Sequence, residues 1–146
     1  MKISKEIING LIICFGIALL FLIVNLLGLE KMTYLRSLNA LIVFYGIYRT
    51  QKMNADKGEF SLGENTLDMF KTGIVGVVTS VIGLAVFATY NGGQSYLDTI
   101  SYGFLFGKNP SLNEYCLGLL VEGMASVAII TLILIQTIKI QSTKNI

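Results

Sequence analysis

Four long apolar segments dominate this chain of 146 residues and constrain its fold more than any other feature. They cover residues 7–29, 35–48, 69–90 and 115–138. A helix needs about 20 apolar residues to cross a hydrocarbon core about 30 Å thick. Three segments reach that length, and the second reaches it only with its flanks. The sequence therefore predicts an all-α integral membrane protein, a four-helix bundle with antiparallel up-down topology.

The composition leaves no room for a soluble domain, so we expect a single transmembrane domain over residues 1–146. Hydrophobic residues make up 53% of the chain and charged residues 14%, whereas soluble domains carry about 25% charged residues. The starts of the last two helices follow from two Ser-x-x-Glu capping boxes, at 61–64 and 111–114. The predicted helices are about 7–29, 33–52, 62–90 and 112–139.

The basic residues predict the threading, because cytoplasmic flanks of membrane helices are enriched in Lys and Arg. Four crossings would place three of the 11 basic residues on one side, namely Lys31, Arg36 and Lys108. The other eight, with both termini, would lie on the opposite side. We therefore expect the N-terminus and the C-terminus in the cytoplasm.

The outer loop between the third and fourth helices carries apolar residues at helical spacing, from Tyr96 to Phe104. This pattern predicts a short amphipathic segment at about 95–106, with Ser95 and Asp98 as a possible cap. Three placements stay open: on the outer leaflet, over the mouth of the bundle, or against a partner protein.

Ionisable and amide side chains within apolar helices are candidates for function. Because neighbouring helices alternate in direction, four such residues from three helices should reach a similar depth near the outer leaflet. We predict that they form an intramembrane polar cluster: Glu122, Arg36, Asn39 and Asn25. One interpretation is a structural clamp in which Glu122 pairs with Arg36. The others are a proton- or cation-coupled site with Glu122 as the titrating carboxylate, and a contact with another subunit or with lipid head groups.

Small residues recur at spacings of three and four on the third and fourth predicted helices, where they let backbones approach closely. The predicted helix-packing face consists of Gly73, Gly76, Ser80, Gly83, Gly118 and Ser126. It serves either packing of these two helices on each other or formation of a homodimer.

The residue types argue against several classes of function. The chain has no His and two Cys, so the usual zinc and haem sites lack ligands. Cys14 and Cys116 are expected to be packing residues. No nucleophile–base set and no phosphate loop occurs in the sequence. We predict no catalytic residue, no cofactor, no metal and no nucleic-acid partner.

Three short stretches resemble a known family: Tyr48-Arg49, then Gly58-Glu59-Phe60-Ser61-Leu62-Gly63, then Phe70-Lys71-Thr72-Gly73. They are similar to small four-helix bacterial inner-membrane proteins classed as a domain of unknown function, common in flavobacteria and their relatives. Those proteins show YR at the end of helix two and a G-x-[IF]-[ST]-[FL]-G element. The resemblance implies the topology and a bacterial inner-membrane location, but no activity, substrate or catalytic residue.

These observations predict a non-enzymatic, multi-pass inner-membrane protein that is a structural or accessory component of the cell envelope or of a membrane complex. The lipid bilayer is its expected partner, with a homo-oligomer or a larger complex as further options. The alternative is a small oligomeric proton- or ion-coupled transporter or channel that uses Glu122. No small-molecule substrate can be named from the sequence.

Overall fold

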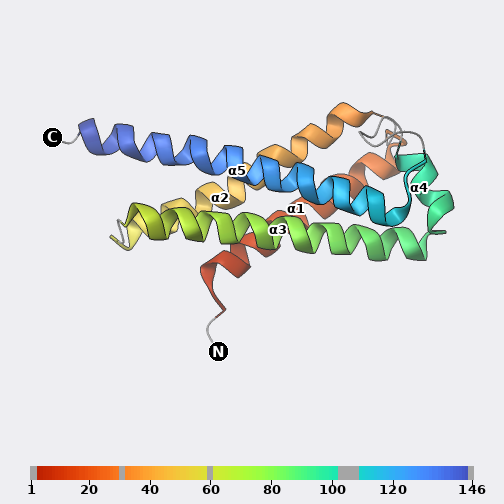
Figure 1. Ribbon diagram of the computed structural model, residues 1–146, viewed down its shortest axis with the longest axis horizontal. Helices are drawn as coiled ribbons and strands as arrows, with labels where there is room; N and C mark the ends of the chain where they lie inside the picture. Colours follow the sequence, from red (N-terminus) through yellow and green to blue (C-terminus); the bar gives the residue numbers. More distant parts are fainter. Residues whose placement is uncertain (1–2, 30–31, 59–60, 102–108, 145–146) are drawn as a thin grey trace.

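The computed structural model describes residues 3–29, 32–58, 61–101 and 109–144, and no strand occurs among them. Figure 1 shows the helices in chain order. They are α1 (Lys5–Leu26), the 3-10 turn η1 (Thr33–Ser37), α2 (Leu38–Asp56), α3 (Leu62–Tyr90), α4 (Gln94–Ile100) and α5 (Leu112–Lys144). The fold is therefore helical throughout the described part of the chain, as the apolar segments predict.

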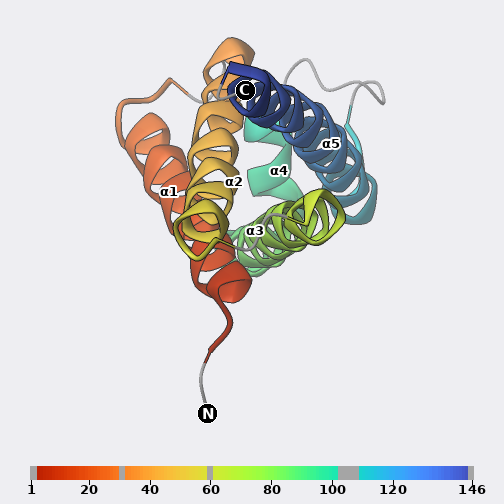
Figure 2. The ribbon, with the colours of Figure 1, turned by 90° about the vertical axis from the view of Figure 1, so that its left-hand side faces the viewer.

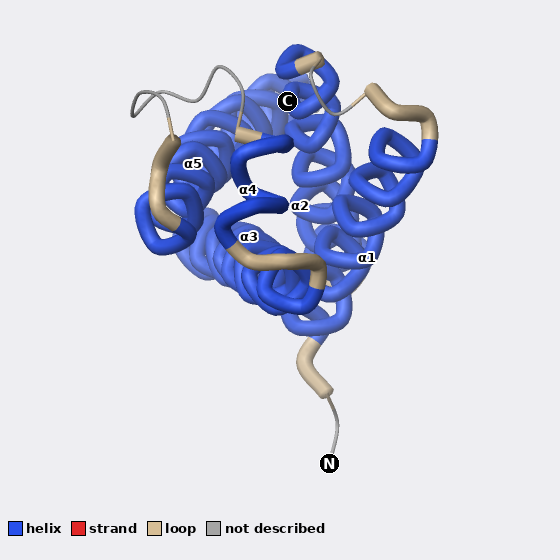
Figure 3. The backbone as a smooth tube through the Cα atoms, turned by 90° about the vertical axis from the view of Figure 1, so that its right-hand side faces the viewer, coloured by secondary structure: helices blue, strands red, loops and turns tan. Residues whose placement is uncertain are grey.

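The long helices α1, α2, α3 and α5 lie side by side around a common core (Figure 2). The short helix α4 lies across one end of this bundle (Figure 3). We call this the α4 end, and we call the other the α2–α3 end, because there α2 leads into α3. α2 diverges from α3 towards the α4 end, and α1 runs obliquely to the other long helices (Figures 1 and 2).

Three of the described helices are long and apolar enough to cross a membrane, in the ranges Lys5–Leu26, Leu62–Tyr90 and Leu112–Thr137. The prediction of four crossings is thus met for three helices. α2 falls short because its second half is polar. Its first expected turn, at Thr33–Ser37, is a 3-10 segment rather than α-helix.

The helix ends follow local signals in most places. α3 has the predicted bounds, and α5 begins at the predicted Leu112 but continues to Lys144. α1 stops at Leu26 and α2 at Asp56, each followed two residues later by a glycine with positive φ. Glycine adopts this left-handed conformation without steric cost, so it ends both helices.

Only one of the two predicted capping boxes forms. At α5, Glu114 accepts a hydrogen bond from the Ser111 amide at 2.8 Å, and the Glu114 amide donates to Ser111 Oγ at 3.4 Å. At α3, Ser61 makes no side-chain cap, so that prediction is wrong. Glu64 instead turns towards a pocket beside α2.

The core of the bundle is mainly apolar. Its fully buried side chains include Ile13, Ile47, Met69 and Val127, one from each long helix. Large apolar side chains on the outer surface stay exposed, for example Phe15 and Leu41. This pattern suits a protein surrounded by lipid, where the outside is as apolar as the inside.

α4 closes the α4 end of the bundle. Leu97 and Ile100 are buried against Tyr115 of α5. Of the three placements open for the outer segment, the described part therefore lies over the bundle mouth. The helix begins at Gln94 with Gly93 as its N-cap, so the expected Ser95 cap is wrong. The rest of that segment, 102–108, lies outside the described residues.

Candidate functional site

Arg36 and Glu122 meet across the bundle at the α4 end. Arg36 lies in η1 just before α2, and Glu122 lies ten residues into α5. Arg36 Nη2 donates to Glu122 Oε2 at 2.9 Å. The Arg36 guanidinium also lies 5.9 Å from the ring centre of Tyr115, within range of a cation–π contact. The alternation of helix direction thus brings these two charges together, as expected.

This ion pair is not sealed from its surroundings. The side chain of Glu122 is 46% exposed and that of Arg36 is 25% exposed. A pair this open contributes little to stability in water. Both charges are therefore accessible to a molecule that enters the space beside them.

Asn25 and Asn39 lie near the pair but are not joined to it. Asn25 is in the last turn of α1 and Asn39 in the first turn of α2. Neither amide makes a side-chain hydrogen bond to any described residue. The predicted cluster of four thus consists of one ion pair and two amides with unused hydrogen-bonding capacity.

A cavity of about 470 Å³ unites the four residues, since all of them line it. It occupies the interior of the bundle between the mainly apolar core and α4, where α2 diverges from α3. Its wall is mainly aliphatic and aromatic, with contributions from every helix, such as Ile17, Val43, Leu84, Phe87 and Leu119. Volumes of 300–1,000 Å³ with apolar walls and a few polar groups are typical of small-molecule sites.

The predicted small-residue face divides among several neighbours. A Cβ on Gly76 would lie 2.7 Å from the Ile13 side chain of α1, and one on Gly73 would overlap Val127 of α5. Gly83 has no atom within 4 Å of a Cβ position and lines the cavity. The face therefore does not serve one helix pair, because α3 packs on α1 and α5 at different positions.

The other members of that face lie on or near the cavity side. Ser80 Oγ donates to the Gly76 carbonyl at 2.6 Å, and Ser126 Oγ to the Glu122 carbonyl at 3.0 Å. Both serines also line the cavity. Gly118 is buried on α5.

A buried polar chain, which the sequence reasoning missed, connects three helices in the α2–α3 half. The Asn9 amide of α1 donates to Thr50 Oγ1 of α2 at 2.8 Å. Thr50 and Thr72 of α3 share a hydrogen bond of 2.8 Å, and Thr72 donates to the Asp68 carbonyl at 2.9 Å. All three side chains are fully buried or nearly so. Asn9, an amide near the start of the first apolar segment, was the available signal.

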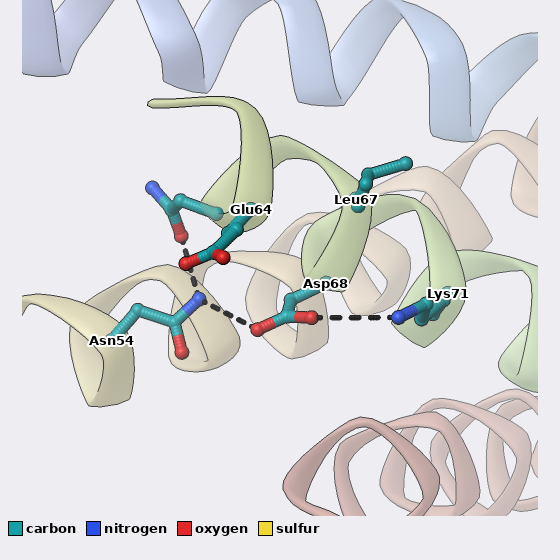
Figure 4. Close-up of a pocket in the computed structure, with 6 residues that line it drawn as sticks. Asn54, Glu64, Leu67, Asp68 and Lys71 are labelled. Atoms are coloured by element: carbon teal, nitrogen blue, oxygen red, sulfur yellow. Dashed lines mark hydrogen bonds and ion pairs between the residues drawn. The ribbon is translucent and has the colours of Figure 1, made fainter. Parts of the chain in front are cut away.

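A second polar group lies at the α2–α3 end, and Figure 4 shows its residues around a shallow pocket of about 250 Å³. Asn54 of α2 donates to Asn65 at 2.8 Å and to Asp68 at 3.3 Å. Asp68 also pairs with Lys5 at 3.2 Å and with Lys71 at 3.8 Å. These contacts tie the start of α1 and the end of α2 to the first turns of α3.

The described residues contain no group of three His, Cys, Asp or Glu side chains able to hold a metal ion. Cys14 lines the cavity, and both cysteines are free thiols. The chemistry that the site offers is thus a pair of opposite charges, two amides and an apolar wall. This set suits binding of an amphipathic molecule.

Comparison with protein families, with curated proteins and with solved structures finds no match to this chain. The resemblance to small four-helix inner-membrane proteins therefore stays a prediction from its motif, of which Glu59 and Phe60 lie outside the described residues.

Proposed function

We propose that this chain is an integral membrane protein of four-helix, antiparallel up-down architecture, with α2 as the fourth crossing. The support is the direction in which α2 presents its polar residues. Thr50 and Asn54 are buried against neighbouring helices, whereas Leu41, Phe44 and Tyr45 are exposed. In lipid, polar groups must find partners within the protein. A helix that buries Thr50 and Asn54 against its neighbours, and keeps its exposed charges Arg49, Lys52 and Asp56 in its last two turns, can cross a bilayer despite a modest mean hydropathy.

The proposed orientation places both termini and the α2–α3 end in the cytoplasm of a bacterial inner membrane, as the basic residues indicate. A cysteine-free background with a single Cys at exposed Lys57 or exposed Asn109 tests it. An impermeant thiol reagent added to intact cells should label position 109 and leave position 57 unlabelled. Labelling at 57 alone would reverse the orientation, and labelling at both would remove a crossing.

We further propose that the protein is non-enzymatic and acts as an accessory or structural component of the envelope or of a membrane complex. The observation that carries this proposal is the use of its intramembrane polar groups. The Asn9–Thr50–Thr72 chain joins α1, α2 and α3, and the Arg36–Glu122 pair joins η1 to α5. These groups bind one another, an arrangement that favours fixed helix positions over proton transfer to a substrate.

Co-purification in mild detergent tests the accessory role. The tagged full chain, extracted at native expression level, should elute with a companion protein in fixed ratio or as a homo-oligomer. A monodisperse single chain in both mild detergent and native membrane extracts would reject the accessory role.

A small oligomeric proton- or ion-coupled transporter is the second candidate, and the exposure of Glu122 to the cavity favours it. A pH-sensitive dye in liposomes with the reconstituted protein separates the two candidates. Flux above protein-free liposomes that Glu122→Gln abolishes would support transport. The accessory role predicts no such flux for the wild type or the variant.

A further inference from the structure

The cavity at the α4 end has the form of a binding site, and its charges indicate the ligand. We propose that it holds one membrane phospholipid whose head group carries a phosphate and a primary ammonium, as in phosphatidylethanolamine. The phosphate binds Arg36, the ammonium binds Glu122, and one acyl chain occupies the apolar part of the cavity. This inference rests on the membrane insertion proposed above.

The cavity has the size of a single chain. Its lining on α5 extends over 12 residues, from Tyr115 to Ser126, or about 16 Å at a rise of 1.5 Å per residue. Its volume of about 470 Å³ equals roughly 15 groups of the size of a water molecule, at about 30 Å³ each. That space suits one acyl chain, and the second chain of the lipid would stay in the bilayer.

The charged end of the cavity lies where a head group would enter. Arg36 lies in η1, Asn39 lies in the first turn of α2 and Asn25 lies in the last turn of α1, all near the α4 end of the bundle. From there the apolar wall continues deeper, to Val43 and Val77. A lipid that enters from this side would leave its polar atoms at the shallow end and its chain at the deep end.

The charge balance selects a zwitterion. An anionic ligand on Arg36 would leave the Glu122 carboxylate beside a second negative charge, which is unfavourable in a low dielectric. A cationic ligand on Glu122 would likewise place a second positive charge beside Arg36. A head group with both charges exchanges the Arg36–Glu122 pair for two pairs, each with charge-assisted hydrogen bonds.

The two amides complete the site. Asn25 and Asn39 line the cavity and make no side-chain hydrogen bond to a described residue. An amide can donate two hydrogen bonds and accept others. The ester and phosphate oxygens of a phospholipid supply acceptors for such donors, and an alkane or detergent tail does not.

Retention of lipid from a defined mixture tests the proposal. The full chain is reconstituted into vesicles of equimolar phosphatidylethanolamine, phosphatidylcholine and phosphatidylglycerol, extracted in detergent and examined by native mass spectrometry. We expect one lipid per chain, with phosphatidylethanolamine retained over phosphatidylglycerol by about tenfold or more. Phosphatidylcholine should be retained less than phosphatidylethanolamine, because its quaternary ammonium cannot donate a hydrogen bond to Glu122. Equal retention of the three lipids, or retention of none, would overturn the proposal.

Two variants test the assigned roles. Glu122→Gln removes the ammonium partner and the negative charge beside Arg36, so the preference should shift from phosphatidylethanolamine to anionic phosphatidylglycerol. An unchanged preference would contradict the role of Glu122. Gly83→Leu fills the cavity where a Cβ meets no atom within 4 Å, so retention of every lipid should fall. The matched control is Val86→Leu on the same helix, which is exposed outside the cavity lining and should leave retention unchanged.

The outcomes separate this inference from the proposed function. A protein that resists carbonate extraction from membranes but retains lipids without preference refutes only the lipid site. A protein that carbonate removes from the membrane refutes the insertion on which both rest. A dimer that excludes lipid from the cavity would assign the space to a second copy and would overturn the lipid proposal.

Discussion

Polar residues lie in different environments in the two halves of the bundle. In the α2–α3 half, Asn9, Thr50 and Thr72 are buried and bonded to one another, and Gly73 and Gly76 lie against neighbouring side chains. In the α4 half, Arg36 and Glu122 stay partly exposed on a cavity, and Gly83 touches nothing. The cavity therefore interrupts close packing, which resumes where Leu97, Ile100 and Tyr115 are buried at the α4 end.

The difference indicates which half fixes the fold and which half can bind a ligand. Buried polar groups that bind one another, as Asn9, Thr50 and Thr72 do, hold helices in a unique arrangement. The Asn9 Oδ1 itself has no hydrogen-bond partner among the described residues. An open cavity with accessible charges contributes little to that arrangement and leaves room for a ligand. Equivalent substitutions in the two halves should therefore have unequal effects on stability.

The largest difference is expected between Gly76→Leu and Gly83→Leu, which lie seven residues apart on α3. At Gly76 the added side chain collides with Ile13, and overpacking of this kind costs about 3 kcal/mol. At Gly83 it enters the cavity, so stability should be unchanged or higher. Thermal unfolding in detergent, followed by circular dichroism, measures both. Equal losses would show that the cavity half is packed as tightly as the other.

The next effect concerns two asparagines of α1. Asn9→Leu removes the donor to Thr50 and leaves the buried Thr50 hydroxyl with one hydrogen bond fewer, at a cost of about 2 kcal/mol. Asn25→Leu should change stability by less than about 0.5 kcal/mol, since that amide bonds to no described residue. A larger loss for Asn25 than for Asn9 would reverse the assignment of the two halves.

Two buried threonines that share no hydrogen bond, Thr72 and Thr131, extend the comparison within the close-packed half. Thr72→Val deletes two hydrogen bonds and should cost about 1.5 kcal/mol. Thr131 is also fully buried, but its hydroxyl has no partner among the described residues. Thr131→Val should therefore stabilise the protein, by about 1 kcal/mol. Urea-dependent unfolding in mixed micelles can resolve the opposite signs, and equal signs would contradict the hydrogen-bond assignment.

The smallest effect is expected at the ion pair. Because Arg36 and Glu122 are partly exposed, their coupling in detergent should be only about 0.5–1 kcal/mol. Glu122→Gln should lower the unfolding temperature slightly, and adding Arg36→Gln should cost little more. A double-mutant cycle isolates the coupling. Strictly additive losses would mean that the two residues do not interact in the folded protein.

Local signals in the sequence predict several helix ends correctly. The α3 bounds are those expected, and the start of α5 follows from the Ser111–Glu114 box. The contact between Arg36 and Glu122 follows from counting residues along helices of alternating direction. Both kinds of prediction depend on position along the chain, which is fixed by the 1.5 Å rise of a helix.

The contacts among Asn9, Thr50 and Thr72 could not be predicted in this way, because they depend on how each helix is rotated about its axis. The division of the small-residue face has the same origin. Gly73 and Gly76 are three residues apart, yet they contact α5 and α1 respectively. Several rotations satisfy the same apolar pattern when lipid surrounds the bundle, because burial of apolar surface does not favour one over another.

By itself, the sequence determined that this chain forms long apolar helices, where most of them begin and end, and which charges reach the same level. Only the tertiary structure decided which helix faces meet and that α2 buries Thr50 and Asn54. It also decided that α2 diverges from α3 towards the α4 end, beside a cavity of about 470 Å³. The physical reason is the distance along the chain over which the interactions act. Helix length and caps arise from neighbours within a few residues, whereas rotation and divergence depend on close contacts among residues far apart in the chain.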